Sequence, residues 1–273
     1  MRIAVTGACG VLGRAVSDLA LSSGHTVLAI DRAATTEPPD RPGLEERRAD
    51  LTDFGQFNAA VADADALVHL AAYITPEAGA DHVVHNNNVV ASYNALSVAA
   101  AHGIDRVCLA SSVNAIGGYY SREPRYDYFP LDEHHRCYAE DPYSLSKWIA
   151  EQQAAAFGRR YERMSIASLR LHALRDRAYM AALVVGRPEA GHKDLWGYTP
   201  VDSAAQACLA AVTADFNGFE TFYVVASDTT SEITSMQLRN RFYPDVPVKR
   251  ELDGHGSFFD TSKAEKLLNW SAP

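Results

Sequence analysis

A tyrosine and a lysine stand one helical turn apart at Tyr143 and Lys147, directly after Asp141-Pro142. Proline suits the first turn of a helix, so both side chains are expected on one face of a helix that starts here. A free tyrosine has a pKa of about 10, which must fall before it can exchange protons readily near pH 7. A lysine ammonium one turn away favours the phenolate, so the pair predicts Tyr143 as a general acid and base.

A serine pair supplies a third group for this chemistry. Ser111 and Ser112 follow the apolar run Arg106–Ala110, at the carboxyl end of a predicted strand. Doubly wound sheets place their ligands at that edge. A hydroxyl there can donate a hydrogen bond to a carbonyl or alkoxide and hold it against the tyrosine. Ser112, Tyr143 and Lys147 are therefore the predicted catalytic residues.

The first apolar run leads into a glycine-rich turn that is followed by a helical stretch. Gly7, Gly10 and Gly13 have the spacing that permits a tight turn, close approach of backbone to a pyrophosphate, and close packing of helix on sheet. Phosphates would meet the free N–H groups at the start of the helix, where Val11 and Leu12 lie. The motif predicts a dinucleotide site.

Acidic and small residues at later strand ends extend this site. Asp31 ends the second predicted strand, where a carboxylate can bind the ribose hydroxyls of NAD and would repel the 2′-phosphate of NADP. Arg32 works the other way, because a guanidinium can pair with that phosphate. NAD is favoured, and NADP is the alternative. Further cofactor contacts are expected from Asp50, Leu51, Leu70, Ala71 and Ala72.

Composition bounds the possible partners. The chain has 273 residues, 47% hydrophobic and 22% charged, with a formal net charge of -9. This balance is ordinary for a globular protein and argues against nucleic acid as a partner. No apolar stretch approaches the roughly 20 residues that span a bilayer. Widely spaced cysteines indicate free thiols in a reducing cytoplasm, and His134, His135 and Cys137 match no metal-ligand spacing.

Short β-rich runs alternate with helical stretches over the first two-thirds of the chain. The runs are mostly apolar throughout, as in parallel strands covered on both faces. This alternation predicts an α/β fold with a doubly wound parallel sheet of the Rossmann type. The predicted strands are Arg2–Thr6, Thr26–Ile30, Arg47–Ala49, Ala66–Leu70, Arg106–Ala110 and Ser165–Leu171. The predicted helices are Val11–Ser23, Phe54–Ala62, Asp81–His102 and Tyr143–Tyr161.

The pattern loosens after Leu171. We expect helices at Asp202–Ala214, Ser235–Phe242 and Thr261–Leu268, and a strand at Phe222–Ala226. Residues 1–171 are the predicted dinucleotide-binding core, completed by about 200–226. Residues 172–199 and 227–273 are predicted to form a small substrate-binding region within the same compact unit. The long polar and aromatic stretch 117–141 has the length of a functional loop, such as a lid.

Taken together, these residues occur in an order and at spacings that resemble the extended short-chain dehydrogenase/reductase family, also called the NAD-dependent epimerase/dehydratase family. The resemblance covers nearly the whole chain and includes Asn88–Asn94, Leu169–Leu171 and Trp196–Asp202. It implies that Tyr143 is the general acid and base, that Lys147 lowers its pKa and binds the nicotinamide ribose, and that Ser112 orients the substrate. It also places Asn88 among the cofactor-binding residues.

Departures from the family pattern bear on the reaction. Nucleotide-sugar dehydratases carry an acidic pair where Val113-Asn114 stands, so elimination of water is not expected. The segment Ser111–Tyr120 is most similar to that of the uronate dehydrogenase branch. That branch has Asn-His at Val113-Asn114 and a serine near His172. The predicted substrate residues are Asn114, His172 and Arg177, of which Arg177 could hold a carboxylate.

The leading hypothesis is an NAD-dependent oxidoreductase that transfers hydride to or from a hydroxyl or carbonyl carbon of a small molecule, such as a sugar or sugar acid. The alternative is an NAD-dependent sugar epimerase. A non-catalytic dinucleotide-binding sensor is less favoured, because the Tyr-x-x-x-Lys pair is kept. A homodimer through 81–102 and 143–161 is expected. The alanines that would pack there, or within one subunit, are Ala91, Ala95, Ala99, Ala154, Ala155 and Ala156.

Overall fold

The computed structural model describes residues 1–33 and 41–273. The strands are β1 (Arg2–Thr6), β2 (Thr26–Asp31), β3 (Leu44–Arg48), β4 (Ala66–His69), β5 (Arg106–Ser112), β6 (Ser165–Leu171) and β7 (Gly218–Val224). The α-helices are α1 (Val11–Ser22), α2 (Phe54–Ala60), α3 (Asp81–His102), α4 (Pro142–Arg160), α5 (Arg177–Val184), α6 (Val201–Thr213), α7 (Ser235–Phe242) and α8 (Ser262–Leu268). Short 3-10 helices are η1 (Pro76–Ala78), η2 (Val113–Ile116) and η3 (Pro188–Gly191).

The strands form one parallel sheet in the order β3-β2-β1-β4-β5-β6-β7. The chain starts at β1, runs outward to β3, and then returns to place β4 on the other side of β1. The strand order therefore reverses between β1 and β4, and ligands of such sheets bind outside the carboxyl ends at this switch point. The predicted doubly wound parallel sheet is confirmed.

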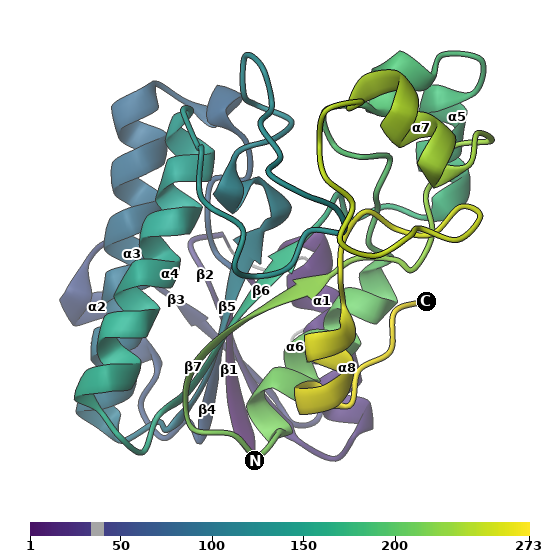
Figure 1. Cartoon of the computed structure of the whole chain (residues 1–273). Helices are drawn as coiled ribbons and strands as arrows, with labels where there is room; N and C mark the ends of the chain where they lie inside the picture. Colours follow the sequence, from purple (N-terminus) through teal and green to yellow (C-terminus); the bar gives the residue numbers. More distant parts are fainter. Residues whose placement is uncertain (34–40) are drawn as a thin grey trace.

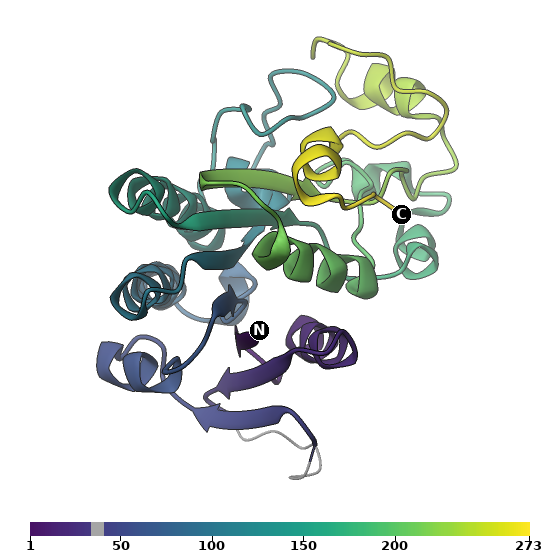
Figure 2. The same cartoon turned by 90° about the horizontal axis from the view of Figure 1, so that it is seen from below.

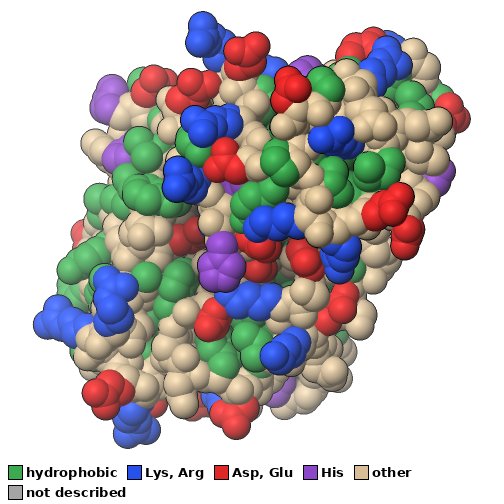
Figure 3. Space-filling view, in the orientation of Figure 1, with side chains coloured by type: hydrophobic (Ala, Val, Ile, Leu, Met, Phe, Trp, Pro, Cys, Tyr) green, Lys and Arg blue, Asp and Glu red, His purple; other side chains and the backbone are tan. Residues whose placement is uncertain are grey.

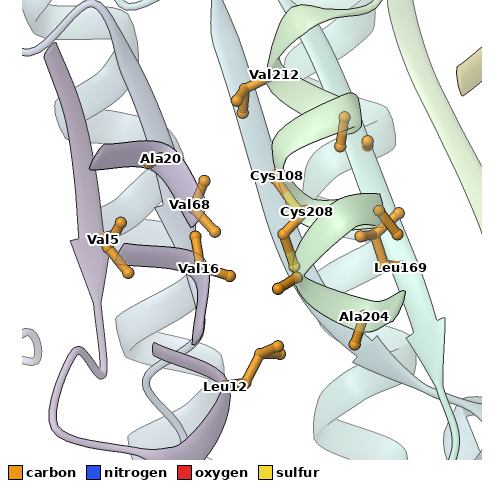
Figure 4. Close-up of a cluster of buried hydrophobic side chains, with 14 of the residues drawn as sticks. Val5, Leu12, Val16, Ala20, Val68, Cys108, Leu169, Ala204, Cys208 and Val212 are labelled. Atoms are coloured by element: carbon orange, nitrogen blue, oxygen red, sulfur yellow. The ribbon is translucent and has the colours of Figure 1, made fainter. Parts of the chain in front are cut away.

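Helices cover both faces of the sheet. In Figures 1 and 2, α2, α3 and α4 lie on one face and α1 and α6 on the other. Helices α3 and α4 pack against each other, and so do α1 and α6. Each helical layer buries its own apolar cluster against the strands. In the cluster beneath α1 and α6, the thiols of Cys108 on β5 and Cys208 on α6 lie close together, and both cysteines are free (Figure 4).

Acidic caps fix where two of these helices begin. The Asp53 carboxylate accepts a hydrogen bond from the backbone N–H of Gln56 at the start of α2. The Asp141 carboxylate accepts one from Ser144 at the start of α4, which has Pro142 in its first turn. A capping carboxylate satisfies an N–H that has no partner within the helix. The cap at Asp141 sets the register of the helix that carries the Tyr–Lys pair.

A third apolar cluster joins the long loop 117–141 to the C-terminal part of the chain. Its members include Tyr126, Phe129 and Leu131 from the loop, and the fully buried Trp196 and Phe258 from later segments. Isolated β-bridges pair Phe129 with Val248 and Leu131 with Phe259. The loop is therefore anchored by side chains that are far away in sequence.

The sequence placed the two edge strands imprecisely. Strand β3 is Leu44–Arg48 rather than Arg47–Ala49, because pairing with β2 extends over charged residues that face solvent. Strand β7 is Gly218–Val224 rather than Phe222–Ala226, because its half-buried first residues pair with β6. Helix α5 was not expected. Its start at Asp176, whose carboxylate accepts from the Tyr179 N–H, is a local cap inside an otherwise irregular stretch.

The surface carries both signs of charge. Lys and Arg side chains are interspersed with Asp and Glu over the face shown in Figure 3, while hydrophobic side chains gather on the side of α3 and α4. Val83, Val90 and Tyr93 of α3 are among the exposed large hydrophobic residues. Within residues 1–33 and 41–273, no helix is long and apolar enough to cross a membrane.

Candidate active site

The turn after β1 depends on the absence of side chains at its glycines. Gly7 has a φ of +67°, and a Cβ there would lie 2.9 Å from the backbone nitrogen of Ala71. A Cβ on Gly13 would lie 2.2 Å from the Gly7 carbonyl oxygen. The Gly10 N–H donates to that same oxygen at 3.0 Å and closes the turn. The backbone packing of this turn therefore requires glycine at positions 7 and 13.

A cleft opens beside this turn, at the switch point of the sheet. Most of the predicted cofactor residues line it: Gly7, Gly10, Asp31, Arg32, Asp50, Leu51, Leu70, Ala71 and Ala72. Its other lining residues, which sequence reasoning missed, are Thr52, Ile74, Asn87 and Ala91. Val11, Leu12 and Gly13 do not line it, since they belong to the first turn of α1 behind the glycine turn.

Two carboxylates of the cleft are held by local hydrogen bonds. The Asp31 oxygens accept from the Cys9 N–H at 3.0 Å and the Ala33 N–H at 3.1 Å. Asp50 accepts from both the N–H and the hydroxyl of Thr52, and these bonds hold the pKa of Asp50 below its usual value. These hydrogen bonds orient both carboxylates as acceptors for hydroxyl or amino groups.

Asn88 is turned away from the cleft, and its neighbour Asn87 lines it instead. The Asn88 amide accepts from the Tyr73 N–H at 2.8 Å and donates to the Tyr73 carbonyl at 2.9 Å. It also donates to the Ser146 hydroxyl on α4 at 3.1 Å. Asn88 is buried and ties the segment after β4 to the helix beside Lys147. Asn88 is therefore hydrogen bonded within the protein, one residue from Asn87, which lines the cleft.

The three predicted catalytic residues converge at the carboxyl end of β5. Ser112 ends that strand, and its hydroxyl oxygen accepts from the Asn114 N–H at 3.1 Å and hydrogen bonds with the buried Tyr143. The Lys147 ammonium donates to the Ala110 carbonyl at 2.6 Å and lies 5.9 Å from the centre of the Tyr143 ring. Spacing by one turn of α4 thus brings both side chains to the end of β5.

Burial dominates the ionisation of these groups. It raises the pKa of Tyr143, which the bond with Ser112 lowers and the Asp141 carboxylate raises further. Burial lowers the pKa of Lys147 to about 8, against the opposing pull of Glu151. The pKa of His69, at the end of β4, falls to about 3 through burial and repulsion by Lys147. His69 is therefore neutral, and Lys147 is a cation near pH 7.

A buried ion pair lies directly behind Lys147. Glu151, one turn further along α4, pairs with Arg170 of β6 through two hydrogen bonds of 2.9 and 2.8 Å. The Ser111 hydroxyl donates to Glu151 at 2.6 Å, and Arg170 donates to the Tyr223 hydroxyl at 3.2 Å. Each charge is compensated within this network, as burial requires.

A small cavity lies on the other side of Ser112, under the long loop. Its lining residues are Val113, Asn114, Ile116, Gly117, Gly118, Tyr126, Leu131, Lys193, Asp194 and Phe259. Asn114 was predicted as a substrate residue. Lys193 and Asp194 were not predicted, although only Leu195 separates them from the Trp196–Asp202 stretch.

The other two predicted substrate residues are engaged by the protein. His172 accepts from the Ala173 N–H at 2.7 Å and hydrogen bonds with the Asp194 carbonyl at 2.9 Å, so both ring nitrogens are used. Burial lowers its pKa to about 4. Arg177 is half exposed and pairs with Asp228 at 2.7 Å, beside a separate cavity between α5 and residues 230–232. The structure does not bring Arg177 together with Asn114.

In the part of the chain that the structure describes, no group of three or more His, Cys, Asp or Glu is placed to hold a metal ion.

Comparison with known proteins gives a consistent family. A putative UDP-glucose 4-epimerase from Methanocaldococcus jannaschii is 29% identical over 163 residues, which is 58% of this chain and 52% of that protein. A uronate dehydrogenase from Pseudomonas putida is 28% identical over 160 residues, 59% of this chain and 56% of that protein. The chain thus spans about half the length of the curated relatives it matches.

The fold also matches solved structures. The structure of MoeE5 in complex with UDP-glucuronic acid and NAD has a TM-score of 0.74 at 22% identity, covering 100% of this chain and 94% of that chain. At this identity the likeness concerns the fold. The family model described as the NAD dependent epimerase/dehydratase family matches residues 3–174, more than half of the chain. The resemblance seen in the sequence is confirmed, and the chain belongs to the NAD-dependent epimerase/dehydratase family of enzymes.

Proposed function

We propose that the chain is an NAD-dependent dehydrogenase that acts on a hydroxyl or carbonyl carbon of a small sugar-like molecule. The observation that carries this proposal is the meeting of Ser112 and Tyr143 at the carboxyl end of β5, with the Lys147 ammonium one turn further along α4. An acid–base hydroxyl, a hydrogen-bond donor for the same oxygen and a nearby cation are the groups that alcohol oxidation and carbonyl reduction require.

The cleft beside the glycine turn fits a dinucleotide. A Cβ at Gly7 would meet backbone, so this wall of the cleft is bare main chain. In our proposal Asp31 accepts the adenosine ribose hydroxyls, which favours NAD over NADP, and Asp50 accepts the adenine amino group. The Arg32 guanidinium lies 5.8 Å from the centre of the Tyr73 ring. It is the group that would pair with the 2′-phosphate of NADP, the less favoured cofactor.

The chemistry divides between the cofactor and the protein. NAD, when bound, accepts the hydride from the carbinol carbon or returns it. Tyr143 takes the hydroxyl proton of the substrate when it is the tyrosinate and returns it when it is the phenol, and Ser112 holds the same oxygen by a hydrogen bond. Lys147 supplies positive charge that favours the tyrosinate. The Tyr120 ring packs edge-on against the Tyr143 ring, with 5.7 Å between the ring centres. This contact excludes water from one side of the Tyr143 phenol.

The test is NADH formation at 340 nm with aldoses, uronic acids and small secondary alcohols. We expect Tyr143→Phe to lose about 10²- to 10⁴-fold in kcat while NAD binding is kept. Tyr120→Phe is the matched control, because it removes a neighbouring phenol that packs against the site without an acid–base part. Full activity of Tyr143→Phe would refute the mechanism.

The same assay separates the alternatives. A sugar epimerase would convert substrate without accumulating NADH, since the hydride returns to the same molecule. A non-catalytic sensor would bind NAD and convert none of the compounds. The family includes epimerases by name, so product analysis must accompany the 340 nm assay.

Three further proposals concern the whole chain. We propose that residues 1–171 and about 200–226 form the dinucleotide-binding core, and that 172–199 and 227–273 form the substrate-binding region. We propose a cytoplasmic homodimer that pairs α3 and α4 across subunits, supported by the exposed Val90 and Tyr93. Of the alanines considered for that interface, Ala91, Ala95, Ala99 and Ala154 are instead buried inside the subunit.

A further inference from the structure

The small cavity beside Ser112 has an uneven lining. Most of its wall is apolar or aromatic: Val113, Ile116, Leu131, Phe259 and the ring of Tyr126, whose hydroxyl is tied to the Lys193 carbonyl at 2.7 Å. Three polar side chains interrupt this wall: Asn114, Lys193 and Asp194. A cavity of this kind orients its ligand through its few polar groups.

Asn114 offers the cavity one unused donor. Its backbone N–H donates to the Ser112 hydroxyl, which places the residue next to the catalytic serine. Its side-chain oxygen accepts from the Tyr119 N–H at 3.0 Å, so the amide is held in one orientation. Among the described residues, none accepts a hydrogen bond from its Nδ2. That atom is free to donate to a ligand.

Asp194 offers one unused carboxyl oxygen. Its Oδ1 accepts from the Trp196 N–H at 3.1 Å, and no described residue other than Asp194 itself donates to Oδ2. The next two residues, Leu195 and Trp196, have φ values of +57° and +54°. Left-handed backbone is unfavourable for residues other than glycine, so the surrounding packing must impose this turn.

That packing is visible around the turn. The Tyr126 hydroxyl donates to the Lys193 carbonyl, and the His172 ring is hydrogen bonded to the Asp194 carbonyl. Trp196 is fully buried and donates through Nε1 to the Pro188 carbonyl at 2.7 Å. The position of the Asp194 carboxyl is therefore fixed from both sides by distant segments.

The nearby cations are already committed. The Lys193 ammonium donates to the carbonyls of Ser121 at 2.9 Å and Arg122 at 3.1 Å, which draws it toward the long loop. Arg177 pairs with Asp228 beside the other cavity. Arg177 therefore lies at the other cavity, and the Lys193 ammonium, which lines this one, is held toward the loop by two neutral carbonyl oxygens.

We propose that Asp194 and Asn114 form the polar end of the substrate site and select an uncharged, hydroxyl-bearing substrate over the corresponding carboxylate. The inference rests on the proposed dehydrogenase function and adds its substrate class. A substrate hydroxyl donates to Asp194 Oδ2 and accepts from Asn114 Nδ2, so both unused atoms are satisfied by one group. A substrate carboxylate would instead face the Asp194 carboxyl group, while the Lys193 ammonium is held by the Ser121 and Arg122 carbonyls, which is a less favourable arrangement.

Burial supports this arrangement. It raises the pKa of Asp194 to about 7, partly offset by the hydrogen bond from the Trp196 N–H. A neutral hydroxyl partner is compatible with either protonation state of this group. A bound carboxylate is compatible only with the protonated one.

The test uses two matched pairs of sugars, galactose with galacturonate and glucose with glucuronate. Binding to the full chain saturated with NADH is followed by nicotinamide fluorescence, which does not depend on turnover. We expect the neutral member of each pair to bind about tenfold or more tightly than its acid. Tighter binding of the acids, or binding of neither member, would overturn the proposal.

Two variants test whether Asp194 is the source of the preference for neutral sugars. Asp194→Asn keeps the shape of the side chain and is expected to reduce the preference for the neutral sugar to less than about threefold. Glu232→Gln removes the same charge at an exposed position beside the other cavity and is expected to keep the wild-type ratio. An unchanged ratio in Asp194→Asn, or the same change in both variants, would overturn the proposal. A single cooperative thermal unfolding transition confirms that each variant is folded.

Turnover separates this inference from the function on which it rests. Selective binding of neutral sugars without NADH formation would refute the dehydrogenase and leave the subsite standing. Preferred oxidation of uronates would keep the dehydrogenase and overturn the subsite. Arg177→Ala tests the rival arrangement, and a selective loss of uronate turnover in that variant would also overturn the proposal.

Discussion

Two sides of Tyr143 are built in different ways. The cofactor side, defined as the glycine turn 7–13 and the cleft beside it, is set by backbone lying against backbone, as where Gly7 meets Ala71. The substrate side, defined as the loop 117–141 and the turn 191–199, is set by side chains from distant segments, such as Tyr126 and His172. The first arrangement follows from local sequence. The second exists only once the chain has folded.

The largest expected effect concerns the network where the two sides meet. Glu151→Gln leaves the buried Arg170 guanidinium without its counter-charge, so we expect a loss of about 3–5 kcal/mol in the free energy of unfolding. Because Glu151 favours the Lys147 ammonium, the variant should also move the alkaline limit of kcat/KM to lower pH. Urea unfolding and a pH–rate profile measure the two effects. Glu162→Gln, at an exposed position just after α4, should change stability by less than about 0.5 kcal/mol. Equal losses in the two variants would contradict the prediction.

On the cofactor side, a side chain added at a glycine of the turn should destabilise the turn and weaken NAD binding. A Cβ on Gly13 meets the Gly7 carbonyl at 2.2 Å, and backbone cannot move aside. We expect Gly13→Ala to cost about 1–3 kcal/mol of stability and to weaken NAD binding by more than about tenfold, measured by titration calorimetry. Gly24→Ala is the control, since Gly24 has a φ of +81° but nothing within 4 Å of its added carbon. It should lose stability without losing NAD affinity.

On the substrate side, a side chain added at a glycine should affect binding of the sugar and leave NAD binding unchanged. A Cβ on Gly191 meets Cδ1 of the fully buried Trp196 at 2.3 Å, nearly the same overlap as at Gly13 but against a side chain. We expect Gly191→Ala to displace the turn that carries Asp194, and so to raise KM for the sugar with the dissociation constant of NAD unchanged. If both glycine variants altered both ligands equally, the division into two sides would be wrong.

This contrast explains how far the sequence could predict the molecule. The sheet and most of the cleft were predictable, because glycine spacing and strand ends specify local geometry, as at Gly7 and Asp31. The hydrogen bond between Ser112 and Tyr143 could also be expected, once the order of the strands was known. The edge strands were misplaced because their pairing partner, rather than their own hydrophobic pattern, sets their extent.

The substrate side could not be predicted in the same way. His172 and Arg177 were chosen because they follow β6, where substrate contacts are expected. In the structure His172 is hydrogen bonded to the backbone of Asp194, and Arg177 pairs with Asp228. Asp194 itself lies in no motif. Its place beside Asn114 depends on an unusual backbone turn that only tertiary packing can impose.

The last expected effect tests that turn without any ligand and develops gradually with pH. Burial raises the pKa of Asp194 from 3.8 to about 7. Between these pH values the folded chain keeps a proton that the unfolded chain has released, so Asp194 makes the free energy of unfolding fall as pH rises. The slope is at most about 1.4 kcal/mol per pH unit for one proton. Asp194→Asn removes this contribution, so the variant should gain stability relative to wild type from pH 4 to pH 7 and then level off.

The measurement must compare the stability–pH curves of wild type and Asp194→Asn, because other groups change the stability of the chain in the opposite direction. Burial lowers the pKa of His172 from 6.5 to about 4, so below pH 6.5 the unfolded chain takes up a proton that the folded chain refuses, and stability falls as pH falls. Over the same interval Asp194 and His172 nearly offset each other in the wild-type curve. Subtraction cancels His172 and leaves Asp194 alone. A flat difference would mean that the carboxyl of Asp194 is solvated, and then the polar end of the cavity would rest on Asn114 only.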